Sequence, residues 1–396
     1  MTFHVLAARA SVTEKRFLDF DPPIFSMQLQ LDLNLPQPPV ETTVVVAMSG
    51  GVDSSVAAAR LVEAGYRVLG IMLRLWVDPF EDMKQARENR CCTFEAVSDA
   101  QRIADQLGIP FRLINASDLF KEIVVDYFIQ EYSQGRTPNP CLMCNRRLRF
   151  DFMLRYAQEE LGADFLATGH YARLRWTPAG VQLLRGVDAR KDQSYVLSMV
   201  PQEALRHLTF PVGEFTKPEV RALARRYGLQ VAEKSESQDL CFTSDYHQFL
   251  KHWADGAVRP GPILDLSGRE LGRHQGLPFY TIGQRKGLGI HSPERLFVVE
   301  LDRARNAVIV GPAEALGRTR LIARNVNWIL AAPQEPIRVT AKIRYKSADH
   351  PATVIPLAEG RVEVRFDAAV RDITPGQGVA FYQNDICLGG GFIERA

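Results

Sequence analysis

The string Ser-Gly-Gly-Val-Asp-Ser at 49–54 constrains the fold more than any other part of this chain. It follows the apolar run 43–48, which predicts a buried strand, and it leads into a helical pattern over 54–64. Two glycines let the backbone turn and come close to an anion without the steric cost of a Cβ atom. The N–H groups at the start of the next helix would then point at the negative charge, with the helix dipole assisting. The segment therefore predicts a phosphate-binding loop between a strand and a helix.

This loop differs from a Walker A motif, which requires Gly-x-x-x-x-Gly-Lys-Ser/Thr. No lysine lies between Val46 and Ala58. A serine-glycine turn that merely caps a helix is the simpler alternative, although a cap does not require all six residues after a strand. The string resembles the PP-loop of ATP pyrophosphatases, which split ATP between the α and β phosphates to adenylate a substrate. In such a loop the serines would add hydroxyl donors, and Asp53 would hold a magnesium ion.

Strands and helices alternate between residue 41 and about residue 199. The predicted strands are 43–48, 67–73, 111–115 and 164–168, and the predicted helices are 54–64, 94–107, 117–133 and 150–161. This alternation implies right-handed crossovers and a parallel sheet with helices on both faces, which is the α/β doubly wound class. Ligands of such sheets bind at the carboxyl ends of the strands. Because the loop 49–54 and the pair Gly169-His170 both follow strands, we expect them to open onto one crevice.

The pattern changes after Pro201. An amphipathic helix is predicted over 216–227 with Thr216 as its N-cap, and short strands broken by glycine follow from about residue 261. The strands near the C-terminus suggest a small antiparallel β-barrel. Residues 1–40 lack clear periodicity and carry two proline clusters, so a mobile N-terminal extension is expected there. The expected domains are a PP-loop catalytic domain at 41–205, a small central domain at 206–320 and a β-barrel at 321–396.

The composition is ordinary for a globular protein, with 46% hydrophobic and 24% charged residues. A formal net charge of +2 does not by itself indicate a nucleic-acid partner, so local clusters must carry that argument. One cluster comprises Arg146, Arg147, Arg149 and Arg155, although such a run is also typical of a solvated helix face. No apolar run reaches the roughly 18 residues of a membrane-spanning helix. Six cysteines in 396 residues indicate reactive thiols in a reducing compartment rather than a disulfide framework, and we expect a cytoplasmic protein without a membrane partner.

Three cysteines lie in segments that favour reactive thiols. Cys141 and Cys144 are predicted in a proline-bounded loop between helices, and Cys241 lies among polar residues, where a thiolate can form and react. Zinc is a rival explanation for the Cys-x-x-Cys pair, but Cys241 has no second ligand close to it in the sequence. An iron–sulfur cluster held by these three thiols is a further alternative. The cysteines expected to be buried small hydrophobes are Cys91, Cys92 and Cys387.

Several longer motifs resemble those of one family, the tRNA-specific 2-thiouridylases. They are the PP-loop and the segments 91–95, 135–145, 168–173, 185–195, 234–242 and 276–290. The resemblance covers about residues 43–394 in the family's order and leaves residues 1–40 outside it. It implies a sulfurtransferase that replaces the position-2 oxygen of the wobble uridine of tRNA by sulfur. ATP would adenylate this oxygen, pyrophosphate would leave into the PP-loop, and sulfur would come from a cysteine persulfide.

The resemblance also implies roles for individual residues. Cys241 would carry the persulfide, and Cys144 would assist as a nucleophile or by closing a transient disulfide with Cys241. The implied ATP contacts are Ala47, Met48, Ser49, Gly50, Gly51, Val52, Asp53, Ser54, the backbone at Leu73 and Gly169. The implied contacts to the flipped base are Asn139, Pro140 and Cys141, and those to the rest of the tRNA are His170, Lys191, Asp192, Gln193, Arg344, Tyr345 and Gln377. The partners would be tRNAs for Lys, Glu and Gln, and a sulfur-relay protein or cysteine desulfurase.

Family members carry either aspartate or cysteine at the position of Cys141, so the cysteine here keeps the cluster alternative open. His170 also has a simpler interpretation, as a structural histidine at the end of a strand. Two other classes of function remain. PP-loop enzymes that deliver ammonia would need an amidotransferase, of which the sequence shows no pattern. An RNA-binding module without enzymatic activity would not require a PP-loop together with separated cysteines in polar segments.

Overall fold

The computed structural model describes residues 35, 38–80, 93–234 and 240–395. The expected N-terminal extension at 1–40 lies outside this part of the chain, apart from residues 35 and 38–40. Cys91 and Cys92 also lie outside the described residues.

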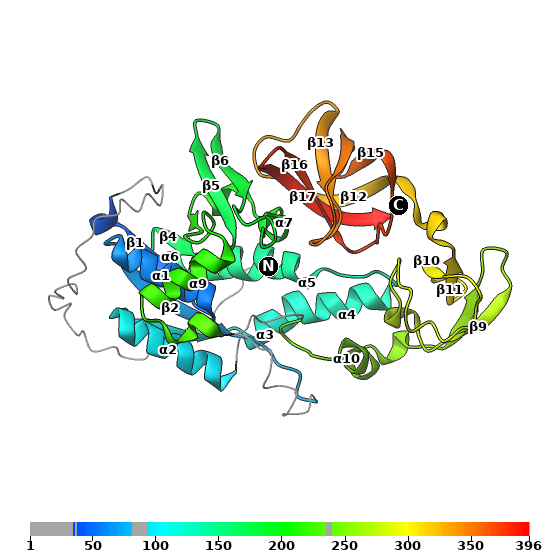
Figure 1. The fold of residues 1–396 in the computed structure, drawn as a ribbon, viewed down its shortest axis with the longest axis horizontal. Coiled ribbons are helices and arrows are strands. Elements are labelled where there is room, and N and C mark those ends of the chain that lie inside the picture. The colour runs from blue at the N-terminus through cyan, green and yellow to red at the C-terminus, as the bar shows by residue number, and fades with distance from the viewer. Residues whose placement is uncertain (1–34, 36–37, 81–92, 235–239, 396) are drawn as a thin grey trace, which may run out of the picture. The chain divides into compact units, whose positions relative to one another are not determined.

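A five-stranded parallel sheet lies in the N-terminal half of the fold (Figure 1). Its strand order is β3-β2-β1-β4-β7. Its strands are β1 (Thr43–Ala47), β2 (Arg67–Arg74), β3 (Phe111–Asn115), β4 (Phe165–Ala167) and β7 (Leu208–Thr209). The central strand β1 is fully buried at Val44, Val45 and Val46. The predicted parallel sheet is therefore confirmed.

Alternate residues of β1 face two separate hydrophobic cores, as the two-residue period of a strand requires. Val44 and Val46 belong to the core that includes helices α1 (Val52–Glu63), α2 (Phe94–Leu107) and α9 (Lys217–Arg226). Val45 faces the other core, which includes the helices of residues 117–161. Helices thus cover both faces, and the predicted doubly wound α/β class is confirmed.

The predicted helix ends follow from local chemistry. The side chain of Thr93 accepts a hydrogen bond from the backbone N–H of Ala96 and caps α2, which ends at Gly108 with a left-handed φ of 66°. At the start of α9, the backbone N–H of Thr216 donates to the carboxylate of Glu219 over 2.7 Å.

Two long helical segments each contain a π-helical stretch. The first consists of α3 (Ser117–Phe120), η3 (Lys121–Val125) and α4 (Asp126–Ser133), and the second of α5 (Pro140–Met143), η4 (Cys144–Met153) and α6 (Leu154–Leu161). The prediction that Cys141 and Cys144 lie in a loop ahead of a helix at 150 is wrong. The side chain of Asn139 caps the helix by accepting from the N–H of Leu142, and Pro140 occupies its first turn. A proline at this position favours helix initiation, so the helix begins ten residues earlier.

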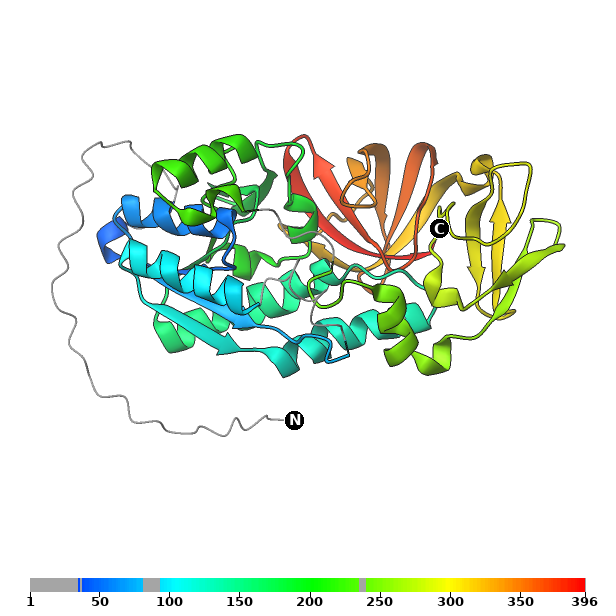
Figure 2. The ribbon, with the colours of Figure 1, turned by 60° about the horizontal axis from the view of Figure 1, so that its bottom comes forward.

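The region after residue 246 contains two β structures (Figure 2). A four-stranded sheet comprises β8 (Gly261–Leu264), β9 (Glu270–His274), β10 (Phe297–Asp302) and β11 (Ala307–Gly311). A barrel comprises β12 (Arg318–Trp328), β13 (Ile337–Lys342), β14 (His350–Pro356), β15 (Val362–Val370), β16 (Gly378–Gln383) and β17 (Ile386–Arg395). Pairing of β12 with both β15 and β17 closes the barrel, so the predicted antiparallel barrel is confirmed.

A hairpin of β5 (Ala172–Thr177) and β6 (Gly180–Arg185) joins the N-terminal half to the barrel, because β6 pairs with β17 at Cys387 and Leu183. The remaining short elements are α7 (Ser194–Leu197), α8 (Gln202–Leu205), α10 (Tyr246–Trp253), η1 (Pro39–Glu41), η5 (Gln230–Glu233), η6 (Asp255–Ala257), η7 (Leu277–Phe279) and η8 (Ala313–Leu316). In the residues that the structure describes, no helix has the length and apolarity needed to cross a bilayer.

Candidate ATP and thiol site

The loop 49–54 has the backbone geometry that an anion site requires. Gly50 has a left-handed φ of 67°, and a Cβ atom there would lie 2.3 Å from the carbonyl oxygen of Ala96, so only glycine fits. The hydroxyl of Ser54 accepts a hydrogen bond from the N–H of Ser49 over 3.1 Å and closes the loop. Helix α1 then begins at Val52 with its N–H groups directed toward the carboxyl end of β1.

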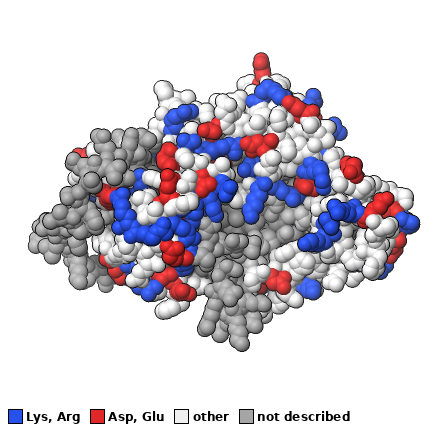
Figure 3. Space-filling model, viewed as in Figure 1, with Lys and Arg blue, Asp and Glu red and all other residues white. Residues whose placement is uncertain are grey.

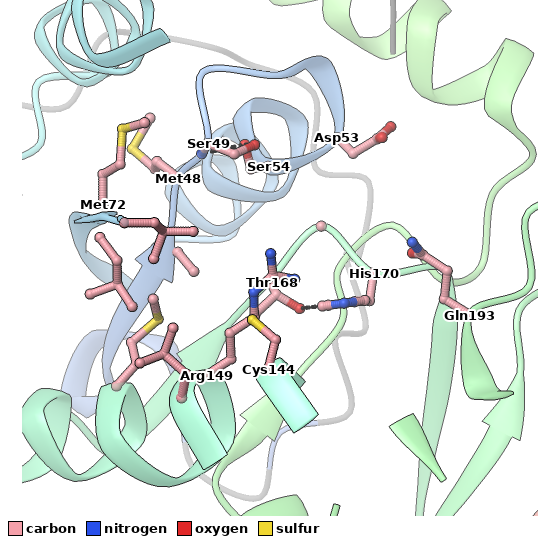
Figure 4. A pocket seen from close by; sticks show the side chains of 16 residues that line it. Met48, Ser49, Asp53, Ser54, Met72, Cys144, Arg149, Thr168, His170 and Gln193 are labelled. Carbon is pink, nitrogen blue, oxygen red and sulfur yellow. Dashed lines mark hydrogen bonds between the residues drawn. The ribbon is translucent and has the colours of Figure 1, made fainter. Parts of the chain in front are cut away.

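A pocket of about 190 Å³ lies beside this loop (Figure 4). Seven of the ten predicted ATP contacts line it, namely Ala47, Met48, Ser49, Asp53, Ser54, Leu73 and Gly169. The other three, Gly50, Gly51 and Val52, form the turn and the first residue of α1. His170 and Gln193 also line the pocket. The loop and the pair Gly169-His170 therefore open onto one crevice, as the strand order predicts.

Gly169 and His170 are packed tightly at the end of β4. A Cβ atom on Gly169 would lie 2.6 Å from the backbone nitrogen of Ser54, so this glycine permits close approach to the start of α1. The ring Nδ1 of His170 lies 2.7 Å from the hydroxyl of Thr168. Burial, with a smaller contribution from the positive charge of Arg149, lowers the pKa of His170 to about 3. His170 is therefore a neutral imidazole in the wall of the pocket.

Two lysines reach the loop from distant parts of the sequence. The ammonium of Lys217 lies 2.8 and 2.9 Å from the two carboxylate oxygens of Asp53. The hydroxyl of Tyr171 donates to the same carboxylate over 2.7 Å. Lys234 lies 3.1 Å from the carbonyl oxygen of Gly50 and 2.6 Å from the carboxylate of Asp99. Sequence reasoning missed both lysines, since neither stands near residue 50 or within a recognisable phosphate motif.

Cys144 lies in the wall of the pocket rather than in an exposed loop. It is 6% exposed and belongs to the main hydrophobic core, so the expectation of polar, loop-like surroundings is wrong for this residue. Cys144 and Arg149 both line the pocket from η4, on the side opposite the phosphate loop (Figure 4). A π-helix pairs residues five apart, which places positions 144 and 149 on one face. Arg149 is thus separated from the other arginines of the cluster.

Cys241 lies against the same core as Cys144. It is partly buried, and the next residue, Phe242, is fully buried. The ring centroid of Phe242 lies 5.2 Å from that of Phe128 and 6.0 Å from that of Phe120. Phe242 therefore anchors Cys241 to the first long helical segment. Cys141, by contrast, is exposed.

The structure bears on both covalent alternatives for these thiols. In the part of the chain that the structure describes, Cys141, Cys144, Cys241 and Cys387 form no disulfide. Among these same described residues, no group of three Cys, His, Asp or Glu side chains is close enough to hold a metal ion. The three thiols are therefore not assembled as a ligand set in this conformation. Cys387 is buried, and burial raises its pKa to about 12, which agrees with the expected inert thiol.

Gln377 of the barrel, predicted as a tRNA contact, holds the chain ahead of the expected base site. Its side-chain amide donates to the carbonyl oxygens of Thr137 and Pro138 over 3.2 and 3.0 Å. Asn139 and Pro140 follow at once and start α5.

Other predicted tRNA contacts differ in their accessibility. The carboxylate of Asp192 is buried and accepts hydrogen bonds from the backbone of Gly186 and Ser194, so it has an internal role here. The guanidinium of Arg344 donates to the carbonyl of Ile282 over 3.1 Å, and its burial lowers its pKa. Lys191 and Tyr345 are partly exposed.

Basic side chains gather over the region of α9 in the view of Figure 3, with acidic side chains among them. Three of the four arginines of the predicted cluster, Arg146, Arg147 and Arg155, line a separate surface groove along η4 and α6. Two of these pair with Asp151, at 2.9 Å for Arg155 and 3.7 Å for Arg147. The groove therefore carries mixed charge.

A parallel sheet whose first strand ends in this loop, beside a pocket that contains a cysteine, defines an ATP-binding α/β protein of the PP-loop class. Family models match most of the described chain: a tRNA methyl transferase HUP domain at residues 42–245, a tRNA methyl transferase PRC-barrel domain at 247–312 and an aminomethyltransferase beta-barrel domain at 318–393. The chain belongs to the family of tRNA-specific 2-thiouridylases, which are tRNA-uridine 2-sulfurtransferases.

The relatives that show this family match over nearly their full length. The tRNA-specific 2-thiouridylase MnmA of Moorella thermoacetica is 53% identical over 356 residues, which cover 88% of this chain and 99% of the relative. That of Symbiobacterium thermophilum is 50% identical, covering 90% of this chain and 93% of the relative. A solved structure, the U34-tRNA thiolase NcsA from Methanococcus maripaludis, is 18% identical with a TM-score of 0.33, covering 57% of this chain and 68% of that one.

Proposed function

We propose that the chain thiolates position 2 of the wobble uridine of tRNAs for Lys, Glu and Gln in two steps, adenylation and sulfur transfer. One observation supports this division above the others. The thiol of Cys144 and the phosphate loop line the same pocket, so the thiol that would complete sulfur transfer lies in the pocket that would receive pyrophosphate.

In the first step, the position-2 oxygen attacks the α phosphorus of ATP, and pyrophosphate leaves into the loop. The backbone N–H groups at the start of α1 and the hydroxyls of Ser49 and Ser54 would hold the leaving group. The pocket of about 190 Å³ is smaller than the roughly 300–1,000 Å³ of most ligand sites, so ATP would extend beyond it.

A magnesium ion, when bound, would neutralise phosphate charge during this step. Asp53 fits this role, because it is the one acidic side chain among the described residues that line the pocket, and carboxylate oxygen suits magnesium. Both of its oxygens already accept hydrogen bonds from Lys217, so that lysine would have to exchange partners.

The flipped uridine would lie next to Asn139, Pro140 and Cys141. Cys141 is the exposed member of this group, and the capping bond of Asn139 fixes the start of α5 below it. The tRNA backbone would contact Lys191, Arg344, Tyr345 and the neighbourhood of Gln377. We propose that residues within 206–320 and 321–396 support it, although β7 and α9 of the first range pack with the parallel sheet. The buried carboxylate of Asp192 would act through the loop that it organises rather than by direct contact.

In the second step, a persulfide on Cys241 delivers the sulfur. A sulfur-relay protein or cysteine desulfurase would load it. The terminal sulfur attacks carbon 2, and AMP leaves with the electron pair of the carbon–oxygen bond. The Cys144 thiolate then attacks the Sγ atom of Cys241, which breaks the persulfide bond and leaves sulfur on the base. A Cys144–Cys241 disulfide results, and an external thiol must reduce it before the next turnover.

The test is the release of AMP and pyrophosphate when ATP and one of these tRNAs are supplied together. Asp53→Asn should lower this release at least a hundredfold, whereas Asp118→Asn, at an exposed position of α3, should leave it unchanged. Release in Asp53→Asn at the wild-type rate would contradict the assignment. Gly50→Val is a poorer test, because its side chain would clash with the backbone of Ala96 and disturb folding.

A further inference from the structure

The phosphate loop contains no lysine, yet an ammonium group touches its acidic residue. We propose that Lys217 is a ligand of the pyrophosphate group, supplied by α9 in place of the lysine that a Walker A loop carries within itself. The inference rests on the proposed use of ATP and adds a residue to that site.

The position of Lys217 is fixed by its surroundings. It is the first residue of α9, and its backbone N–H donates to the carboxylate of Asp188 over 2.9 Å. Only 8% of the residue is exposed, and the ammonium lies within 2.9 Å of both oxygens of Asp53. A lysine so buried requires an anionic partner. In this conformation Asp53 supplies it.

The charge of the pocket explains why such a lysine is needed. Among its described lining residues, Asp53 is acidic and Arg149 is basic, and Arg149 lies on the wall opposite the loop. Pyrophosphate released at the loop would therefore meet the carboxylate of Asp53 at close range. Lys217 would cancel this repulsion, and its ammonium would then pair with a phosphate oxygen as well as with the carboxylate.

Lys234 differs from Lys217 in what it holds. Its ammonium binds the carbonyl of Gly50 and the carboxylate of Asp99, and its own carbonyl accepts from Arg221 over 3.0 Å. Lys234 thus fixes the turn of the loop from behind. The lysine whose carboxylate partner lines the pocket is Lys217, so the ligand role falls to it.

Calorimetric titration of the full chain with magnesium pyrophosphate, without tRNA, tests the inference. Lys217→Met should weaken binding about tenfold or more, as the loss of one charge-assisted hydrogen bond predicts, and should flatten the salt dependence. Lys217→Arg should keep the affinity within about threefold. The matched control is Lys121→Met, which removes a lysine–aspartate pair of 2.7 Å between η3 and Asp126 of α4. It should bind as the wild type does.

The outcomes separate the two proposals. Wild-type affinity in Lys217→Met would overturn the inference while leaving the PP-loop assignment in place. Equal losses in the Met and Arg variants would also overturn it, because the loss would then follow packing rather than charge. If Lys217→Met does not melt cooperatively, Lys217→Arg alone decides the question. An affinity within about threefold of the wild type supports the inference, and a larger loss contradicts it. A wild-type protein that neither binds pyrophosphate nor releases it from ATP with tRNA would instead refute the proposed function.

Discussion

The side-chain amide of Gln377 lies 3.0 Å from the carbonyl oxygen of Pro138, so a residue of the C-terminal barrel holds the chain directly ahead of Asn139 and Cys141. A second bond from the same amide reaches Thr137. This contact joins segments 239 residues apart and links the barrel to the segment that starts α5. Gln377 would therefore position the base site whether or not it also touches tRNA.

Gln377→Ala should lower the rate of thiolation at saturating tRNA more than it weakens tRNA binding. The lost bonds contribute roughly 0.5–1.5 kcal/mol each, enough to loosen the start of α5. Single-turnover thiolation and a gel-shift titration measure the two effects. Gln383→Ala is the matched control, since Gln383 also donates to a backbone carbonyl within the barrel, over 3.0 Å to Arg338. A loss confined to tRNA affinity would mean that Gln377 acts as a direct contact.

His170 should make the protein less stable in acid. Its pKa is lowered to about 3 in the fold, so the unfolded chain binds one more proton between about pH 3 and the ordinary value of 6.5. Stability must therefore fall as the pH drops through this window. Urea unfolding at pH 7 and pH 4.5 should show a smaller loss in His170→Gln than in the wild type. The exposed His291→Gln serves as control, and an identical pH dependence in all three proteins would refute the effect.

The sequence predicts the parallel sheet and the loop because both depend on local pattern. Residues 44–48 before the loop are all apolar, and the predicted N-cap at Thr216 is a short-range signal that the structure confirms. The hairpin β5–β6 and the strands β12 and β17 escape prediction. Their residues alternate less clearly, and they are stabilised by pairing with distant strands.

The candidate site likewise contains residues that the local sequence predicts and residues that it does not. The glycines of the loop are recognisable since their conformation is set within a few residues. The lysines at Asp53 and Gly50 are not, because 164 and 184 residues separate the partners. The helical segment that carries Cys144 begins at an Asn-Pro cap. The same residue pair is typical of a turn, so the sequence predicts a loop at this position. A π-helix has no local sequence signature, so the pairing of Cys144 with Arg149 on one wall becomes visible only in the fold.

Arg149→Met should impair chemistry rather than tRNA binding. Arg149 lines the pocket with Cys144, where its positive charge would stabilise a thiolate or the phosphate of the adenylated base. We expect thiolation to fall at least tenfold with tRNA affinity unchanged. Arg155→Met, which removes an exposed arginine paired with Asp151, should have little effect on the rate. The reverse result, weaker tRNA binding with a normal rate, would mean that Arg149 contributes to tRNA binding and not to the chemistry.

Cys141→Asp separates the persulfide relay from an iron–sulfur cluster. An aspartate at this exposed position can coexist with a relay through Cys144 and Cys241, but it is an unusual cluster ligand. After anaerobic purification, we expect the variant to retain thiolation and to contain no more iron and acid-labile sulfide than the wild type. If activity and iron disappear together, the cluster is the better explanation, and the three thiols must then come together in a conformation other than this one.

Cys144, Cys241 and Cys387 should respond differently to replacement by serine. If adenylation precedes sulfur transfer as proposed, Cys241→Ser should still consume ATP with tRNA but form no 2-thiouridine, because the sulfur carrier is missing. Cys144→Ser should also lose thiolation, since no thiolate remains to break the persulfide bond. Cys387→Ser should keep full activity and lose roughly 1–3 kcal/mol of stability, because a buried thiol is replaced by a hydroxyl in the barrel. Mass spectrometry of nucleosides from complemented cells, with pyrophosphate release measured on the purified proteins, reads out each variant. Full thiolation in Cys241→Ser would show that another residue carries the sulfur.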